Sequence, residues 1–207
     1  MSAKKKIRCF AIMVIGNVFM GMGVSLFKMS GLGNDPWTGM LMGVSDAIGM
    51  VYAHFSVAVN LGLFVLQVLL GRRLIGAGTV VNGLGLGYIV TFWMKTWASL
   101  FPQPELLVVR LILMAVGMVI TSFGLSLYQA ADMGVAPYDS LSMIMTERLK
   151  KIPYFWNRVF TDGVCTVICW ISGGIVGVGT LVTVFALGPF ISFFHKYCAE
   201  KLIGAEE

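Results

Sequence analysis

The fold is decided by a short stretch that occurs twice in the chain: Gly31-Leu32-Gly33-Asn34-Asp35-Pro36-Trp37-Thr38 and Met133-Gly134-Val135-Ala136-Pro137-Tyr138-Asp139-Ser140. Each copy is a glycine-containing turn followed by proline, an aromatic residue and a small polar residue. A shift of 101 residues aligns the two copies, and residues 10–98 then match residues 111–199 with 19 identities in 89 positions. Composition alone would give about seven. The sequence therefore predicts an internal duplication.

The composition is that of a membrane protein. The 207-residue chain is 57% hydrophobic and 12% charged, with a mean hydropathy of +0.85. These values exclude an ordinary soluble globule, and apolar runs of about 20 residues, the length that crosses a bilayer core, recur along the chain. We therefore expect an all-α multi-pass protein whose first partner is the lipid bilayer. The net charge of +5 is ascribed to basic cytoplasmic loops, and no nucleic-acid binding is expected.

Six transmembrane spans are predicted, at about residues 10–29, 53–71, 79–97, 107–130, 154–172 and 175–195. A short helix follows the first span of each half, over residues 36–50 and 137–151, and each begins at a proline, which suits the first helical position. The chain then divides into a cytoplasmic N-terminus (1–9), a first repeat (10–101), a linker (102–106), a second repeat (107–199) and a tail (200–207).

Two topologies are compatible with this pattern. If the short helices do not cross the membrane, each half has three spans and the halves are inverted; if they cross, each half has four spans and the halves run parallel. Each basic pair is present at only one of two matching positions, because Arg72-Arg73 align with Gly173-Gly174 and Lys150-Lys151 align with Gly49-Met50. This is expected if matching positions face opposite sides of the membrane. Lys95 and Lys196 match and argue the other way, but single span-end lysines can snorkel. We favour an inverted 3+3 repeat with both termini cytoplasmic.

The motifs resemble a known group. Gly-Leu-Gly-x-x-Pro-Trp after the first span, Gly76-x-Gly78-Thr79-x-x-Asn82-x-x-x-x-Gly87, and the stretch from Ala136 to Leu141 are similar to the YczE/YyaS/YitT group of bacterial integral membrane proteins. The resemblance covers nearly the whole chain and implies a plasma-membrane protein, usually taken for a transporter. In that group an Asp commonly follows the Trp; here Thr38 has that place, and only the second copy keeps the acid, as Asp139.

Asp162 is the leading candidate for a functional residue. It falls near the middle of the span at 154–172, and a carboxylate at that depth faces a cavity or a partner. It either forms an i,i+4 ion pair with Arg158 or serves as a proton- or cation-coupling site. Its repeat counterpart is Leu61, next to the polar Asn60, so the acid is specific to the second half.

The two short helices supply the other candidates. If they are re-entrant, their N-termini face substrate at membrane depth, and Trp37 and Tyr138 wall a pocket; if they are interfacial, these rings are anchors and Asp35 and Asp139 are caps. The predicted substrate-binding set, in full, is Asp162, Trp37, Thr38, Tyr138, Asp139, Ser140, Lys28, Gln129, Asn82 and Asn60, with backbone turns at Gly33, Pro36, Gly134 and Pro137. Lys28 either attracts an anion, pairs with Asp35 or snorkels, and Asn82 either joins the site or bonds two helices.

Two functions remain open from the sequence. The first is a secondary transporter or small-molecule-binding protein; the second is an accessory protein that stabilises or recruits a partner complex. No metalloprotease, nucleophile-elbow or Walker motif is present, so no catalytic residue, metal or cofactor is expected. Cys165 and Cys169, one helical turn apart, are interpreted as packing residues. A 3+3 bundle is small for a transport pathway, which makes a homodimer an additional expectation.

Overall fold

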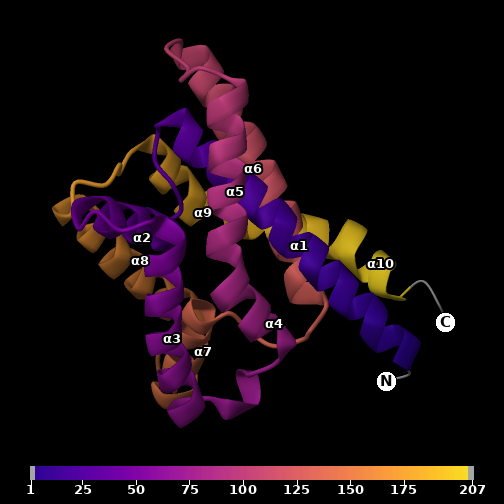
Figure 1. Ribbon diagram of the computed structural model, residues 1–207. Helices are drawn as coiled ribbons and strands as arrows, with labels where there is room; N and C mark the ends of the chain where they lie inside the picture. Colours follow the sequence, from indigo (N-terminus) through magenta and orange to yellow (C-terminus); the bar gives the residue numbers. More distant parts are fainter. Residues whose placement is uncertain (1–2, 205–207) are drawn as a thin grey trace.

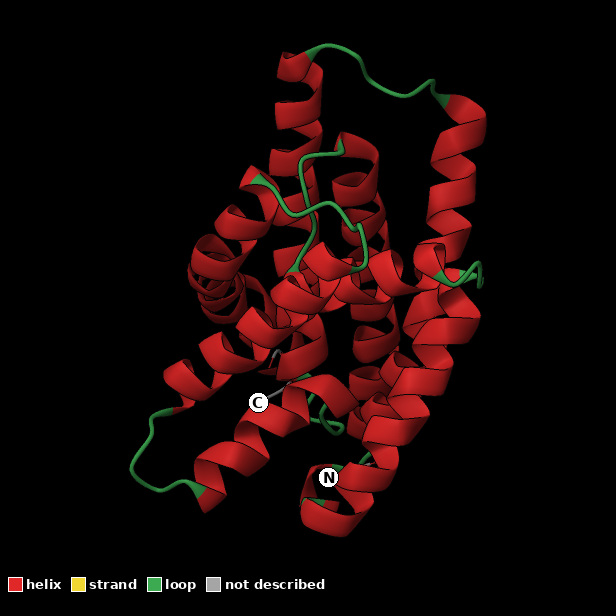
Figure 2. Ribbon diagram, turned by 90° about the vertical axis from the view of Figure 1, so that its left-hand side faces the viewer, coloured by secondary structure: helices red, strands yellow, loops and turns green. Residues whose placement is uncertain are grey.

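The computed structural model describes residues 3–204, and all regular secondary structure in that range is helical (Figures 1 and 2). The first half consists of α1 (Ala3–Ser30), α2 (Pro36–Ala47), α3 (Tyr52–Leu70), η1 (Arg72–Leu74), α4 (Ala77–Val80), the π-helical η2 (Val81–Gly85) and α5 (Leu86–Leu100). The second half consists of α6 (Leu107–Ala130), α7 (Pro137–Arg148), α8 (Tyr154–Ile171), α9 (Val178–Phe194), the π-helical η3 (His195–Ala199) and α10 (Glu200–Gly204).

Five helices are long and apolar enough to cross a membrane: α1, α3, α4 through α5, α6, and α9 through α10. The predicted sixth span became α8, whose first half carries Asn157, Arg158 and Asp162, and it is not among the five. α2 and α7 have 12 residues each, which is too short to cross a typical core. The protein is thus a multi-pass helical membrane protein, and the count of six spans stays a prediction.

α1 and α6 form the central packed pair, crossing in the middle of Figure 1. Their backbones meet at glycines: a Cβ added to Gly16 would lie 2.7 Å from the carbonyl oxygen of Gly124, and one added to Gly23 would lie 2.7 Å from that of Gly117. Such close approach is how helices associate in lipid, where apolar burial gives little driving force. The contact therefore depends on the absence of side chains at these positions.

The two glycine turns dock on opposite halves of the molecule. Gly78 donates its N–H to the carbonyl of Met133 at 2.7 Å, and Gly179 donates its N–H to the carbonyl of Leu32 at 2.8 Å. Each acceptor is followed by a glycine with positive φ: Leu32 by Gly33, at 116°, and Met133 by Gly134, at 105°. These turns bring the N-termini of α2 and α7 into the interior, where Pro36 and Pro137 are buried.

The short helices begin at the predicted residues but by different means. Asp35 caps α2 by accepting the N–H of Thr38 at 3.0 Å, with Pro36 in the first turn, as predicted. The cap position of α7 is Ala136, which makes no side-chain cap bond. Asp139 is therefore in the first turn of α7, and its interpretation as a cap is wrong. Both helices also end three residues early, at Ala47 and Arg148, against the predicted ends at 50 and 151.

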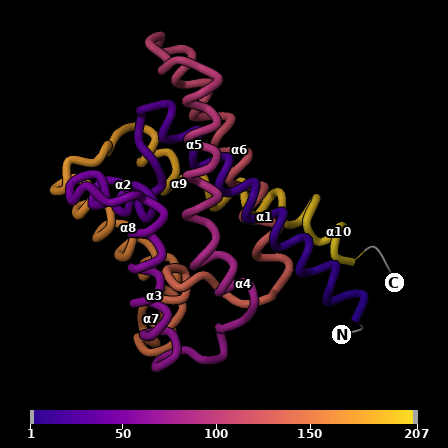
Figure 3. The backbone as a smooth tube through the Cα atoms, viewed as in Figure 1, coloured from indigo at the N-terminus to yellow at the C-terminus, as the bar shows by residue number. Residues whose placement is uncertain are grey.

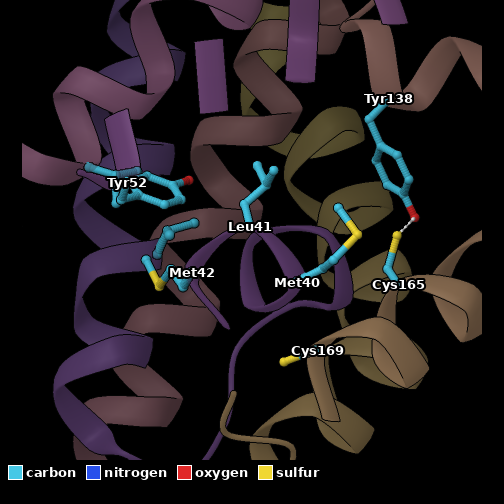
Figure 4. Close-up of a cluster of buried hydrophobic side chains, with 9 residues drawn as sticks. Met40, Leu41, Met42, Tyr52, Tyr138, Cys165 and Cys169 are labelled. Carbon is cyan, nitrogen blue, oxygen red and sulfur yellow. Dashed lines mark hydrogen bonds between the residues drawn. The ribbon is translucent and has the colours of Figure 1, made fainter. Parts of the chain in front are cut away.

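A buried cluster joins the two halves around α2. α2 packs against α8 and α7 packs against α3, so each short helix contacts a long helix of the other half (Figure 3). Figure 4 shows the cluster, which includes Leu41 and Met42 of α2, Tyr138 of α7, and Cys165 and Cys169 of α8. Both cysteines are buried free thiols, which confirms their interpretation as packing residues.

Candidate binding cavity

An ion cluster connects the start of α7 with the middle of α8. Arg158 donates from Nη1 to Asp139 Oδ1 at 2.5 Å and from Nε to Asp162 Oδ2 at 3.3 Å. The hydroxyl of Tyr138 donates to the other oxygen of Asp162, Oδ1, at 2.5 Å. The guanidinium carbon of Arg158 also lies 4.8 Å from the centre of the Tyr138 ring, which adds a cation–π contact. The predicted Arg158–Asp162 pair is therefore one part of a four-residue cluster.

The three charged members of this cluster line a cavity of about 430 Å³ between α6, the N-terminal ends of α2 and α7, α8 and α9. A volume of this size lies in the usual range for small-molecule sites. Its polar lining includes Asp35, Gln129, Asp139, Tyr154, Arg158, Asp162, Thr183 and Ser192, and its apolar lining includes Pro36, Leu125, Phe155, Val159, Val184, Phe185, Leu187, Pro189 and Ile191.

The charged lining has more acids than bases: three carboxylates, those of Asp35, Asp139 and Asp162, against the guanidinium of Arg158. The Asp139 and Asp162 side chains are only 22% and 13% exposed, so water screens them little. Oδ1 of Asp35 is buried without a hydrogen-bond partner in residues 3–204, while its Oδ2 accepts the Thr38 N–H. A buried carboxylate oxygen without a partner is costly unless a proton or cation compensates it.

The aromatic residues of the two repeated stretches meet each other inside the molecule. The rings of Trp37 and Tyr138 stack with centroids 4.3 Å apart and an interplanar angle of 9°. Tyr138 is only 4% exposed, so the alternative in which both rings are outward-facing interfacial anchors does not fit this geometry. The stack instead holds the Tyr138 hydroxyl against Asp162 from the α2 side.

The structure brings some predicted site residues together and separates others. Asp162, Asp139, Gln129 and Pro36 line the cavity, and Tyr138 and Trp37 support it. Thr38 and Ser140 are buried, and Ser140 donates its hydroxyl to the Pro137 carbonyl in its own helix. Gly33 and Gly134 form the turns as predicted.

Neither the cavity lining nor the ion cluster includes Lys28, Asn82 or Asn60. Lys28 pairs with Asp46 at 3.0 Å, not with Asp35, and both line a smaller cavity of about 240 Å³. Asn82 donates to Asn17 at 2.9 Å, which is the helix-to-helix bond that the sequence left open. Asn60 donates to the Ser56 carbonyl one turn earlier in its own helix.

Sequence reasoning missed three contributors to the cavity. The sequence suggests no binding role for Asp35 or Tyr154, and the pairing of Arg158 with Asp139 spans 19 residues. The repeat alignment does indicate the ion cluster. Three charged residues of the second half, Asp139, Arg158 and Asp162, align with uncharged residues of the first half. Those counterparts are Thr38, Val57 and Leu61.

Tyr138→Phe tests the bond from the tyrosine hydroxyl to Asp162. The substitution keeps the stack with Trp37 but removes one donor to a partly buried carboxylate, which we expect to cost about 1–2 kcal/mol. The melting temperature of the detergent-purified protein should fall, while Tyr88→Phe, at a half-exposed tyrosine of α5, should leave it unchanged. Equal melting temperatures for both variants would show that the hydroxyl contributes nothing.

Long apolar helices around a charged interior cavity define the chain as a multi-pass helical membrane protein. It belongs to the Family of unknown function (DUF6198), which matches residues 7–196. The resemblance to YyaS and YczE is also confirmed. The protein YyaS of Bacillus subtilis is 28% identical over 87% of this chain and 89% of its own, and the membrane protein YczE of the same organism is 24% identical over 86% and 81%.

A third relative, an uncharacterized protein of Haemophilus influenzae, is 24% identical over 93% of this chain and 85% of its own. No solved structure matches the chain. These comparisons place the chain among membrane proteins and assign no substrate.

Proposed function

We propose that this protein is a secondary transporter or small-molecule-binding membrane protein, coupled to a proton or cation through Asp162. The observation that carries the proposal is the cluster of Asp139, Arg158 and Asp162 on the wall of the 430 Å³ cavity. Ionisable groups inside a membrane bundle are costly, and they usually mark substrate or ion pathways. The proposal assigns no catalytic residue and no cofactor.

The same proposal makes α8 the sixth span. Its charged side chains face the cavity, whereas its opposite face is apolar and exposed, as a lipid-facing surface would be; that face comprises Trp156, Phe160, Val164, Val167 and Trp170. Arg158 and Asp162 neutralise each other by pairing, which lowers the cost of placing them in the bilayer.

We further propose an inverted 3+3 arrangement in the bacterial plasma membrane, with both termini cytoplasmic. Contacts between the halves occur in matched pairs related by the 101-residue shift, which supports a two-fold arrangement of duplicated halves, and the positions of the basic pairs favour its inverted form. The Gly78–Met133 bond corresponds to the Gly179–Leu32 bond, and Trp37 stacks on its own counterpart, Tyr138. Inverted repeats of this kind place substrate at the interface between halves, where the ends of α2 and α7 meet the cavity.

A ligand screen on Asp162→Asn tests the proposed function. Thermal stability of the purified wild type would be measured across small metabolites and ions, at acidic and neutral pH. A ligand that binds only the folded state raises the melting temperature by mass action. At a ligand concentration of about a hundred times Kd, the free energy of unfolding rises by about 2.7 kcal/mol. We expect at least one ligand to stabilise the wild type and to lose this effect in Asp162→Asn.

The matched control is Glu147→Gln, which removes a carboxylate paired with Arg73 outside the cavity. Its ligand response should equal that of the wild type. A screen without any stabilising ligand, in which Asp162→Asn is merely less stable, would contradict the proposal and favour the accessory-protein function.

A further inference from the structure

We propose that the cavity takes an organic cation, of the alkylammonium or alkylguanidinium class, which binds Asp139 and Asp162 in exchange with Arg158. This assignment of a substrate class rests on the proposed function. It starts from the charge of the lining, which has three carboxylates and one guanidinium. A bound monovalent cation offsets part of this surplus, whereas an anion would add to it.

The Arg158 side chain shows how the site recognises a planar cation. Carboxylates from two helices accept from its Nη1 and Nε, and the Tyr138 ring lies 4.8 Å from its guanidinium carbon. Two carboxylates plus an aromatic face form the standard chemistry for binding guanidinium or ammonium groups. The same three groups can therefore hold the head group of a ligand once Arg158 withdraws.

The geometry allows Arg158 to withdraw. Its side chain is 31% exposed, and its bond to Asp162 is long, at 3.3 Å, compared with 2.5 Å to Asp139. Rotation of this flexible side chain toward the cavity would release Asp162 first. The released carboxylate keeps the Tyr138 hydroxyl as a partner, so it stays positioned for an incoming cation.

Asp35 supplies an independent observation. It approaches the same cavity from α2, and its Oδ1 is buried without a hydrogen-bond partner among the described residues. A buried carboxylate oxygen without a partner is costly, and a cation in the adjacent cavity or a proton on Asp35 would compensate it. The wall also contains apolar side chains, and Phe155, Phe185 and Leu187 are available to contact the hydrocarbon part of the ligand.

The charge preference of the cavity is tested with three compounds of similar size, each with a phenyl ring on a short alkyl chain: phenethylammonium, which is cationic, phenethyl alcohol, which is neutral, and phenylacetate, which is anionic. Each would be titrated against the detergent-purified wild type near neutral pH, with the melting temperature and equilibrium binding as readouts. We expect saturable binding of phenethylammonium only. Asp139→Asn and Asp162→Asn should each weaken it by roughly tenfold or more, the equivalent of losing one charge-assisted bond, and Glu147→Gln should not change it.

Arg158→Gln provides a variant whose expected effect is a gain. Without the competing guanidinium, phenethylammonium and ethylguanidinium should bind about tenfold more tightly than to the wild type, and they should raise the variant's melting temperature more. Loss of function through misfolding cannot produce tighter binding, so this variant separates recognition from stability.

The outcomes distinguish this inference from the proposed function. If a neutral or anionic compound binds the wild type and is lost in Asp162→Asn, the cavity is a binding site but not for cations, and the inference is overturned. If no cationic probe binds the wild type or Arg158→Gln, the inference is overturned as well, and the broad metabolite screen still decides whether the cavity binds anything.

Discussion

Arg158→Met is expected to lower the free energy of unfolding by about 2–3 kcal/mol, because it leaves two carboxylates without their shared cation. Asp139 and Asp162 are 22% and 13% exposed, so water compensates them in part, and the expected loss is smaller than for a fully buried pair. Methionine keeps most of the side-chain volume of arginine, which separates the loss of charge from the loss of packing. The measurement is thermal or denaturant unfolding of the purified protein.

A second substitution supplies the control for Arg158→Met. Adding Asp139→Asn removes one of the two repelling carboxylates, so the double variant should recover part of the lost stability, although each single variant is destabilised. Recovery of this kind is the non-additivity that double-mutant cycles measure in contacting groups. Strictly additive losses would contradict the account of Arg158 as the shared partner of both acids.

Gly124→Ala is expected to lower the free energy of unfolding by about 2 kcal/mol through overpacking between α1 and α6. The added Cβ would lie 2.5 Å from the amide nitrogen of Met20 and 2.6 Å from the carbonyl oxygen of Gly16. Both are backbone atoms, so the clash cannot be relieved by a side-chain rotation and the two helices have to move apart. The melting temperature should fall clearly.

The matched control is Gly62→Ala in α3, where an added Cβ meets nothing within 4 Å. Alanine has the higher helix propensity, so this variant should be as stable as the wild type or slightly more stable. If Gly124→Ala and Gly62→Ala melted at the same temperature, the close packing of α1 on α6 would not hold in the folded protein.

Much of the local structure could be predicted because it depends on nearby residues. Asp35-Pro36 predicted the start of α2 through capping and the fixed φ of proline, and the apolar run at Leu107–Ala130 gave the bounds of α6. The ends of the short helices could not be placed as well. α2 ends at Ala47, two residues before Gly49, whose positive φ of 69° belongs to a turn that only the folded structure shows.

The cavity could be predicted only in part, because it depends on which helices pack together. Asp162 and Arg158 are four residues apart on one helix, so their pairing follows from helical geometry. The partnership of Arg158 with Asp139, and the approach of Asp35 from the other half, depend on the packing of α7 and α2 against α8. Spacing along the chain contains no information on that packing.

The partner of Lys28 also depends on packing. The sequence left an anion contact, a pair with Asp35 and snorkelling open, but α2 folds back so that its C-terminal end, with Asp46, comes within 3.0 Å of the lysine. The positive charge is therefore held away from the cavity of Asp139 and Asp162. This separation helps to keep that cavity acidic.

The most direct test of a transport cavity at Asp139, Arg158 and Asp162 is uptake of a stabilising ligand into proteoliposomes. Wild type, Asp162→Asn and Glu147→Gln would be reconstituted side by side, with empty vesicles as the baseline. We expect saturable uptake by the wild type and by Glu147→Gln, and uptake at the level of empty vesicles for Asp162→Asn. Undiminished uptake by Asp162→Asn, or binding without any uptake by the wild type, would contradict a transport role for this cavity.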